Sequence, residues 1–322
     1  MADPVDHEQH IAVDADLEST ESTYSEELSS YSTSLASSVR NYEWRNGRRY
    51  HAYQSGSYNF PNDEAEQDRL DMFHHCIVRL ASDGKLFFAP VENMDGRRVL
   101  DIGTGTGIWP LKKVGDRHPS AELILGNDLS PIQPPWVPPN LKFLIDDVEA
   151  EWAHEKPFDL IHSRYMAASI QDWPKLVKQC FDNLKHGGWV EFQDYDTPPH
   201  SEDGTVKPDN NVVKMINLLG EACDKAGREL NPGPKLEQWV KDAGFVNVNH
   251  RILKLPVGTW PKDKQLKQIG AFMTMQYTEG IDAVTNVPFT QSLGWKKSEV
   301  EVFNAKVKAD ALDRNVHALH HL

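Results

Sequence analysis

The chain has 322 residues, of which 39% are hydrophobic and 25% are charged, and it carries a formal net charge of −14 at pH 7. This composition describes an ordinary soluble protein that forms one large domain or a domain with a sizeable elaboration. The sequence contains neither the basic stripe expected of a nucleic-acid-binding protein nor a run of about 18 apolar residues. We therefore expect neither direct binding to nucleic acid nor a transmembrane segment.

The beginning of the chain differs in composition from the rest. Residues 1–39 contain nine Asp or Glu residues and no Lys or Arg, and they are rich in serine. Such a segment has too few apolar side chains to bury, so we predict an acidic, Ser-rich disordered tail. It lacks the basic start and apolar middle of a signal peptide. Composition favours a solubilising tail, and a phosphorylated or partner-binding tail is the alternative.

Residues 40–90 are expected to form a helical lid. Apolar side chains recur at intervals of three and four from Leu70 to Leu80, which predicts a helix over residues 63–81. Cys76 lies within it, and the other cysteines are Cys180 and Cys223. Three widely spaced cysteines favour a reducing compartment without disulfides, and their spacing excludes a zinc site of the CxxC type.

Residues 91–260 alternate between strand and helix patterns. This alternation predicts an α/β fold with a mostly parallel sheet and helices on both faces. The predicted strands cover residues 97–102, 121–128, 141–147, 158–164 and 187–196, and the predicted helices cover 107–117 and 173–184. An insertion follows at about 198–233, and the alternating segment 246–258 predicts a sixth strand nearer an edge of the sheet.

A glycine loop with an acid follows the first predicted strand, in the stretch VLDIGTGTGIWP. Asp101 is followed by Gly103, Gly105 and Gly107, but the third glycine of a GxGxxG dinucleotide motif and the lysine of a P-loop are both missing. Glycines let the backbone approach a ligand closely, and the next helix offers its N–H groups to a carboxylate. Asp128, at the end of the second strand, can accept hydrogen bonds from two ribose hydroxyls. The pattern predicts a site for a nucleoside-like ligand.

These residues resemble the first motif of the class I S-adenosylmethionine-dependent methyltransferases. The resemblance implies a Rossmann-like fold and S-adenosyl-L-methionine as the cofactor, with Asp128 on its ribose and the pair Asp147 and Val148 on its adenine. Composition alone does not separate Asp147 from Asp146, and Asp147 could instead cap the loop after the third strand. The residues expected to bind the cofactor are Asp101, Gly103, Thr104, Gly105, Gly107, Asp128, Leu129, Asp147, Val148 and Arg164.

A narrower resemblance, to the LaeA-like fungal methyltransferases, extends from about Tyr42 to the end of the chain. It rests on stretches that are not general methyltransferase motifs, among them residues 46–75 and NDLSPIQPPWVPPN at 127–140. Some members of that group associate with velvet-domain regulators. The resemblance therefore implies a role in secondary metabolism and development, in complexes with velvet-domain or similar regulatory proteins, in the cytoplasm, the nucleus or both. The alternatives are a cofactor-binding scaffold with little catalysis and a small-molecule O-methyltransferase of a biosynthetic pathway.

Catalytic residues are difficult to assign because methyl transfer can proceed by alignment and desolvation alone, and a base is needed only when the acceptor loses a proton. His74 and His75 are candidates for such a base, or they are structural histidines of the lid. Arg164 could orient a carboxylate or the methionyl end of the cofactor, or pair with an acid. Tyr50, Tyr58 and His74 are candidates for facing the acceptor, although aromatic residues also pack lids.

Residues 261–322 are predicted to form a C-terminal helical segment, with helices near 262–278 and 296–315. The fold normally ends with an antiparallel strand beside the fifth, but no strand-like pattern follows residue 316, so we expect this final strand to be absent. The histidines near the end have no acidic neighbours at metal-ligand spacing. We interpret them as the end of a helix and predict no metal site: His317, His320 and His321.

Overall fold

The computed structural model describes residues 42–54, 56, 58–91, 93–115 and 117–322, so the predicted tail lies outside the described residues. Its central feature is a five-stranded parallel sheet with the strand order β5-β4-β3-β6-β7. The strands are β3 (Arg98–Ile102), β4 (Leu123–Asp128), β5 (Leu141–Ile145), β6 (Phe158–Arg164) and β7 (Leu184–Gln193). Each lies within a few residues of a predicted strand, and the predicted α/β, Rossmann-like architecture is confirmed.

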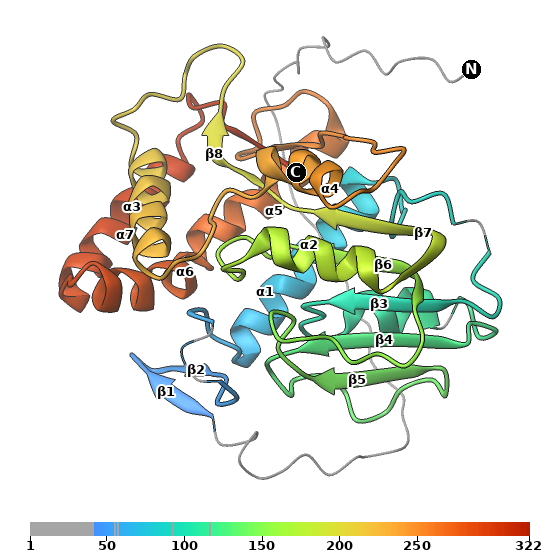
Figure 1. The fold of residues 1–322 in the computed structure, drawn as a ribbon. Helices are drawn as coiled ribbons and strands as arrows, with labels where there is room; N and C mark the ends of the chain where they lie inside the picture. Colours follow the sequence, from blue (N-terminus) through green and yellow to red (C-terminus); the bar gives the residue numbers. More distant parts are fainter. Residues whose placement is uncertain (1–41, 55, 57, 92, 116) are drawn as a thin grey trace.

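The sheet is covered on both faces, as the unbroken apolar character of its central strands requires. One face packs against α2 (Trp173–Asp182), which crosses the strands in Figure 1. Its buried contacts include Ile102, Phe158, Ile161, Trp173 and Leu176. The other face packs against the segment after the lid helix and the turn after the glycine loop, and its buried residues include Val78, Met94, Val99, Trp109 and Leu160.

The lid begins with a hairpin that the sequence analysis did not predict. Strands β1 (Glu43–Arg45) and β2 (Arg48–Tyr50) are joined by Asn46 and Gly47, which both have positive φ. Asn-Gly is the preferred pair for such a two-residue turn, so the signal was present. The lid helix α1 (Glu64–His75) follows and continues as a π-helical segment, Cys76–Ala81, so the helix predicted over residues 63–81 is observed in two parts.

The C-terminal helices pack together beyond the carboxyl ends of the strands, where α3, α6 and α7 form a group in Figure 1. Phe73 and Ile77 of the lid join their buried cluster, so the two ends of the described chain share one core. The remaining helical segments are α3 (Asn211–Lys225), α4 (Gly233–Asp242), α5 (Lys264–Thr278), α6 (Ile281–Val287), α7 (Lys297–Ala311) and the π-helical turns Pro110–Gly115 and Pro288–Ser292. Among the described residues, no helix combines the length and the apolar character needed to cross a bilayer.

The expectation that the final strand is absent was wrong. Strand β8 (Asp196–His200) follows β7 after two residues, and β10 (Leu319–His321) lies antiparallel between β8 and β9 (Lys254–Pro256). A three-residue strand of sequence Leu-His-His has no β-branched residue and no alternation to detect. The predicted sixth strand, 246–258, is likewise reduced to β9.

The interpretation of the C-terminal histidines as a helix end was also wrong. Helix α7 ends at Ala311, His320 and His321 belong to β10, and His317 precedes that strand. The acidic partner of His317 is distant in sequence but close in space: Asp203 Oδ2 lies 2.6 Å from His317 Nδ1.

Candidate functional site

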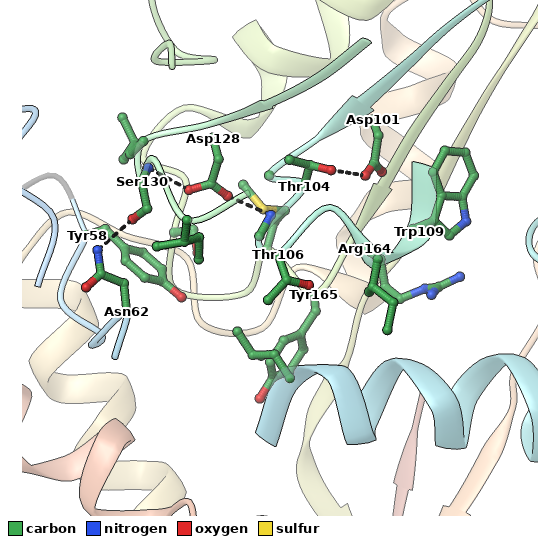
Figure 2. Close-up of a pocket in the computed structure, with 18 of the residues that line it drawn as sticks. Tyr58, Asn62, Asp101, Thr104, Thr106, Trp109, Asp128, Ser130, Arg164 and Tyr165 are labelled. Atoms are coloured by element: carbon green, nitrogen blue, oxygen red, sulfur yellow. Dashed lines mark hydrogen bonds between the residues drawn. The ribbon is translucent and has the colours of Figure 1, made fainter. Parts of the chain in front are cut away.

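A cleft lies at the carboxyl ends of the central strands, beneath the lid helix α1 (Figure 2). Its volume is about 1290 Å³, including the open space at its mouth. Parallel strands bring their carboxyl ends to one edge of the sheet, which is where ligands bind in open α/β folds. The predicted residues that line the cleft are Tyr58, His74, Asp101, Gly103, Thr104, Gly105, Asp128, Leu129, Asp147, Val148 and Arg164.

Asp128, at the end of β4, holds the glycine loop in place. Its Oδ2 accepts a hydrogen bond from the Gly105 backbone N–H at 2.8 Å, and its Oδ1 accepts one from Ser130 N–H at 2.8 Å (Figure 2). The enclosed position of this carboxylate raises its pKa to about 6 despite these donors. Each carboxylate oxygen can accept more than one hydrogen bond, so Asp128 can also accept from ribose hydroxyls.

The glycines of the loop have different structural roles. Gly103 has a φ of +64°, and a Cβ there would lie 2.3 Å from Met166 Sδ on the wall of the cleft. Gly107, also at positive φ, does not line the cleft; a Cβ at this position would lie 2.3 Å from the Phe143 ring. In this structure Gly107 packs the loop onto β5, and its expected contact with the cofactor stays a prediction.

Asp101, at the end of β3, belongs to a buried polar network. It accepts a hydrogen bond from Thr104 Oγ1 at 2.7 Å, and its other oxygen lies 2.7 Å from His162 Nδ1 on β6. The His162 ring stacks on Trp109 at 4.0 Å, and Trp109 Nε1 donates to the Leu86 carbonyl. These contacts fix the start of the helix after the glycine loop, where N–H groups can face a carboxylate.

Asp147 and Val148 follow β5 and lie on the wall of the cleft together with Asp146. Asp147 Oδ1 accepts a hydrogen bond from the Glu149 backbone N–H at 2.9 Å. The alternative interpretation, a carboxylate that caps this turn, is therefore observed. Because capping uses one oxygen in this geometry, contact with an adenine amino group stays a prediction for the same residue.

The lid contacts the loops at the strand ends through side chains that the sequence analysis did not single out. Thr106 Oγ1 donates to Asp71 Oδ1 at 2.5 Å. Asn62 Nδ2 donates to Ser130 Oγ at 3.1 Å (Figure 2). No local pattern predicts these pairs, because their members are 35 and 68 residues apart. They hold the lid over the region where the ribose is expected.

Arg164, at the end of β6, hydrogen-bonds to three groups within the protein. Its Nε donates to Gln193 Oε1 at 2.6 Å, one Nη donates to the Leu86 carbonyl at 3.0 Å, and the other lies 3.1 Å from His74 Nδ1. The loss of hydration lowers its pKa to about 10. These partners are an amide, a carbonyl and an imidazole, and the expected pairing with an acid is not among them. Arg164 therefore ties the lid helix to β6 and β7.

Two residues proposed for the site lie elsewhere. His75 is exposed, and its ring lies 6.3 Å from that of Phe272 on α5. Successive helical residues point about 100° apart, so His74 faces the cleft and His75 does not. Tyr50 is 1% exposed, lies in β2 and does not line the cleft; burial raises its pKa to about 12.

Tyr165 and Met166 line the cleft in a turn after β6 that was not predicted. Tyr165 has a φ of +62°, which is uncommon for a residue other than glycine. The turn is held by Asp194, whose carboxylate accepts hydrogen bonds from the backbone N–H groups of Met166 at 2.7 Å and Ala167 at 3.3 Å. The signal was an acid just after the fifth strand, but its partner could not be read from the sequence.

Comparison with known proteins decides the family. A family model described as a methyltransferase domain matches residues 72–250. Methyltransferase pytC of Aspergillus terreus is 51% identical over 287 residues, which cover 89% of this chain and 88% of that protein. Secondary metabolism regulator LAE1 of Cochliobolus heterostrophus is 35% identical, covering 86% and 91%, and protein-methionine methyltransferase laeA of Emericella nidulans is 33% identical, covering 85% and 72%.

The chain is a LaeA-like S-adenosylmethionine-dependent methyltransferase. S-Adenosylmethionine is its cofactor, and the sulfonium of this cofactor supplies an activated methyl group. The cleft fits the cofactor, since Gly105 lines it at a φ of +56° and a Cβ at this position would meet nothing within 4 Å. In this LaeA-like methyltransferase, Asp128 would hold the ribose and the glycine loop would lie against the methionyl part. The lid would exclude water, and the contribution of the protein to the reaction is alignment and desolvation.

Proposed function

We propose that this LaeA-like methyltransferase acts in the control of secondary metabolism and development, in complexes with velvet-domain or similar regulatory proteins in the nucleus, the cytoplasm or both. Support comes from relatives at 33–35% identity whose names describe secondary metabolism regulators. The observation that carries the catalytic part is the cleft itself, where Asp128 and the glycine loop face the lid. A scaffold that does not bind the cofactor would not require this geometry.

The covered cleft also bears on the methyl acceptor. The lid crosses the cleft and is held by Asp71 and Asn62, so the acceptor is a single side chain or a small molecule. The cleft histidines each use their Nδ1 within the protein, His74 with Arg164 and His162 with Asp101. An acceptor with no proton to lose needs no base. We favour a protein side chain of this kind, in line with the name of the laeA relative, a protein-methionine methyltransferase.

A small-molecule acceptor is the second candidate. The name of the relative at 51% identity describes a methyltransferase and mentions no regulator. The wall around Tyr165 is rich in apolar and aromatic side chains, which suits an apolar ligand of limited size: Tyr58, Leu70, Phe73, Tyr165, Met166 and Ile170. The carboxylate acceptor suggested by Arg164 has less support, because three of the five Arg164 N–H groups are used within the protein.

Methyl transfer from cofactor labelled with tritium in the methyl group tests these candidates. The full chain is incubated with it alone, with purified velvet-domain proteins and with a fungal metabolite extract. Radioactivity in a protein supports the protein acceptor if it is lost when the methionines of the labelled peptide are replaced. Radioactivity in the organic extract supports the small-molecule acceptor. If the chain binds the cofactor but transfers no methyl group, the result would contradict the proposed catalysis and support the role of a scaffold. The Asp128→Ala variant serves as the control with weakened cofactor binding.

A further inference from the structure

Three potential metal ligands meet on the small antiparallel sheet, away from the cleft. They are Asp196 and His200 of β8 and His321 of β10, and the ligand atoms that they offer lie within 4.8 Å of one another. None of them lines the cleft. The end of the chain reaches this group only because β10 pairs with β8 and β9.

The strand pairing explains how residues so distant in sequence come together. Asp196 and His321 are directly opposite partners in the antiparallel ladder, so their side chains lie on the same face. The register shifts between Leu319 and His321, and such irregularities bend a strand and redirect its side chains. His200 Nε2 lies 2.9 Å from Asp196 Oδ2, and the His200 and His321 rings stack at 4.3 Å with an interplanar angle of 13°.

The chemistry of the group suits a transition-metal ion. Imidazole nitrogens and carboxylate oxygens are common ligands of such ions, and the group offers two of the first and one of the second. Lys254, the β9 residue opposite His321, pairs with Glu202 at 2.6 Å, and this pairing offsets its repulsion of a bound ion. Ligand atoms of a tetrahedral zinc site lie about 3.3 Å apart with bonds of about 2.0 Å. Side-chain movements of about 1 Å would close the group around an ion.

We propose that Asp196, His200 and His321 form a Zn²⁺ site that joins β10 to β8, with water as the fourth ligand. Two imidazoles and one carboxylate are a ligand set that zinc uses with an open fourth position. On binding, the contact between His200 Nε2 and Asp196 Oδ2 would be replaced by one bond from each residue to the ion. The neutral imidazole of His200 would then carry its proton on Nδ1, and a proton held on Nε2 before binding would move there through water. This proposal is independent of the proposed acceptor and partners.

The site would stabilise the three-stranded antiparallel sheet in which β10 is the central strand. His320, next to His321, hydrogen-bonds to Tyr277, and its ring packs on Tyr195, the residue after Asp194. Fixing β10 would therefore oppose local opening of this layer. We expect zinc to act on stability and not on the chemistry of methyl transfer, because the site lies outside the cleft.

The test is zinc binding to the untagged full chain after removal of metal by a chelator. Elemental analysis after dialysis is expected to find about one Zn²⁺ per chain, and zinc is expected to raise the melting temperature by mass action. Asp196→Asn, His200→Gln and His321→Gln are each expected to weaken binding by about tenfold or more. Circular dichroism establishes whether each variant is folded. One folded variant is enough to test whether its side chain binds zinc.

Two controls identify the site. His317→Gln removes a histidine of the same segment that also pairs with an aspartate, at 2.6 Å, but lies outside the group. His7→Gln/His10→Gln removes the histidines near the N-terminus of the sequence. Both are expected to bind zinc like the unaltered chain. Binding below about 0.2 equivalents, or binding that all three ligand variants retain, would overturn the proposal.

Discussion

The two walls of the cleft use their polar groups in different ways. The loop wall consists of the glycine loop 101–107 and Asp128, whose carboxylate accepts two backbone N–H groups from the strand-end loops. The lid wall consists of α1 and Arg164, and there the polar side chains contact each other, as in the pair Arg164 and His74. The Asp128 carboxylate of the loop wall can accept further hydrogen bonds from a polar ligand. The hydrogen-bond donors of the lid wall instead contact other protein groups and hold the lid in position.

This difference separates residues that bind from residues that hold the site together. A substitution in the loop wall is expected to change cofactor affinity more than stability. A substitution among the donors of the lid wall is expected to change stability more than affinity. Both quantities can be measured without knowing the methyl acceptor, by calorimetric titration with S-adenosylhomocysteine and by thermal or denaturant unfolding.

The largest effect is expected for Gly103→Val in the loop wall. The substitution forces a β-branched residue to a φ of +64° and places its Cβ 2.3 Å from Met166 Sδ. Backbone strain of about 1 to 3 kcal/mol adds to overpacking of about 1 to 3 kcal/mol, so the loop is expected to leave its binding conformation. We expect affinity for S-adenosylhomocysteine to fall by about 100-fold or more.

Gly84→Val is the matched control for this prediction. Gly84 also has a positive φ, +80°, but a Cβ there would meet nothing within 4 Å, and the residue does not line the cleft. It is expected to lower the melting temperature while leaving affinity unchanged. Equal affinity for the Gly103→Val and unaltered proteins would refute the role of the loop.

Asp128→Ala is expected to have the next largest effect. It removes the acceptor for two backbone N–H groups and for the expected ribose hydroxyls. Hydrogen bonds to a charged group are worth about 1.5 to 3 kcal/mol, so affinity should fall by about 10- to 100-fold. Asp146→Ala, a neighbouring acid on the cleft wall, is the comparison. If Asp146→Ala weakens binding more than Asp128→Ala, the assignment of the ribose site is wrong.

Arg164→Met tests the lid wall. The substitution leaves Gln193, the Leu86 carbonyl and His74 without this donor. We expect the free energy of unfolding to fall by about 1 to 3 kcal/mol and affinity for the cofactor to change by less than about threefold. Arg97→Met is the comparison: it removes an exposed guanidinium that lies 3.5 Å from the Asp159 carboxylate, and it should cost about 1 kcal/mol or less. A loss of affinity above tenfold with unchanged stability would place Arg164 on the cofactor.

The loop wall could be predicted from the sequence because its information is local. Apolar strands without alternation indicate a covered parallel sheet, and the topology then brings the ends of consecutive strands to one edge. Asp101, Asp128 and Asp147 are strand-end residues, so their common location followed from counting strands. Their placement in the cleft did not require knowledge of any long-range side-chain contact.

The lid wall and the final strand could not be predicted in this way. Whether Tyr50 or Tyr58 faces the cleft depends on how a hairpin turns, and that is decided by tertiary packing. Strand β10 has only three residues and exists because two partners flank it. The approach of His321 to Asp196 likewise depends on a pairing across more than 100 positions, for which a single sequence contains no local signal.

The smallest predicted effect is a pH dependence of cofactor binding that arises in the loop wall. Burial raises the pKa of Asp128 from 3.8 to about 6 in the empty cleft. Ribose hydroxyls donate to the ionised form, so bound cofactor lowers this pKa. Affinity is therefore highest above pH 6 and decreases as the pH falls through 6. Between pH 7.5 and 5.5 we expect the dissociation constant for S-adenosylhomocysteine to rise by about fourfold.

Stability of the empty protein should respond with the opposite sign. The raised pKa means that the folded state binds more protons than the unfolded chain between pH 3.8 and about 6, so the Asp128 contribution to stability grows as the pH falls through that window. Asp194, whose pKa burial raises to about 7, adds a contribution of the same sign at higher pH. Asp128→Asn separates the two, because its cofactor affinity should lose the dependence centred near pH 6. A fourfold change that persists in Asp128→Asn would assign the titration to Asp194 and to the turn that carries Tyr165 and Met166.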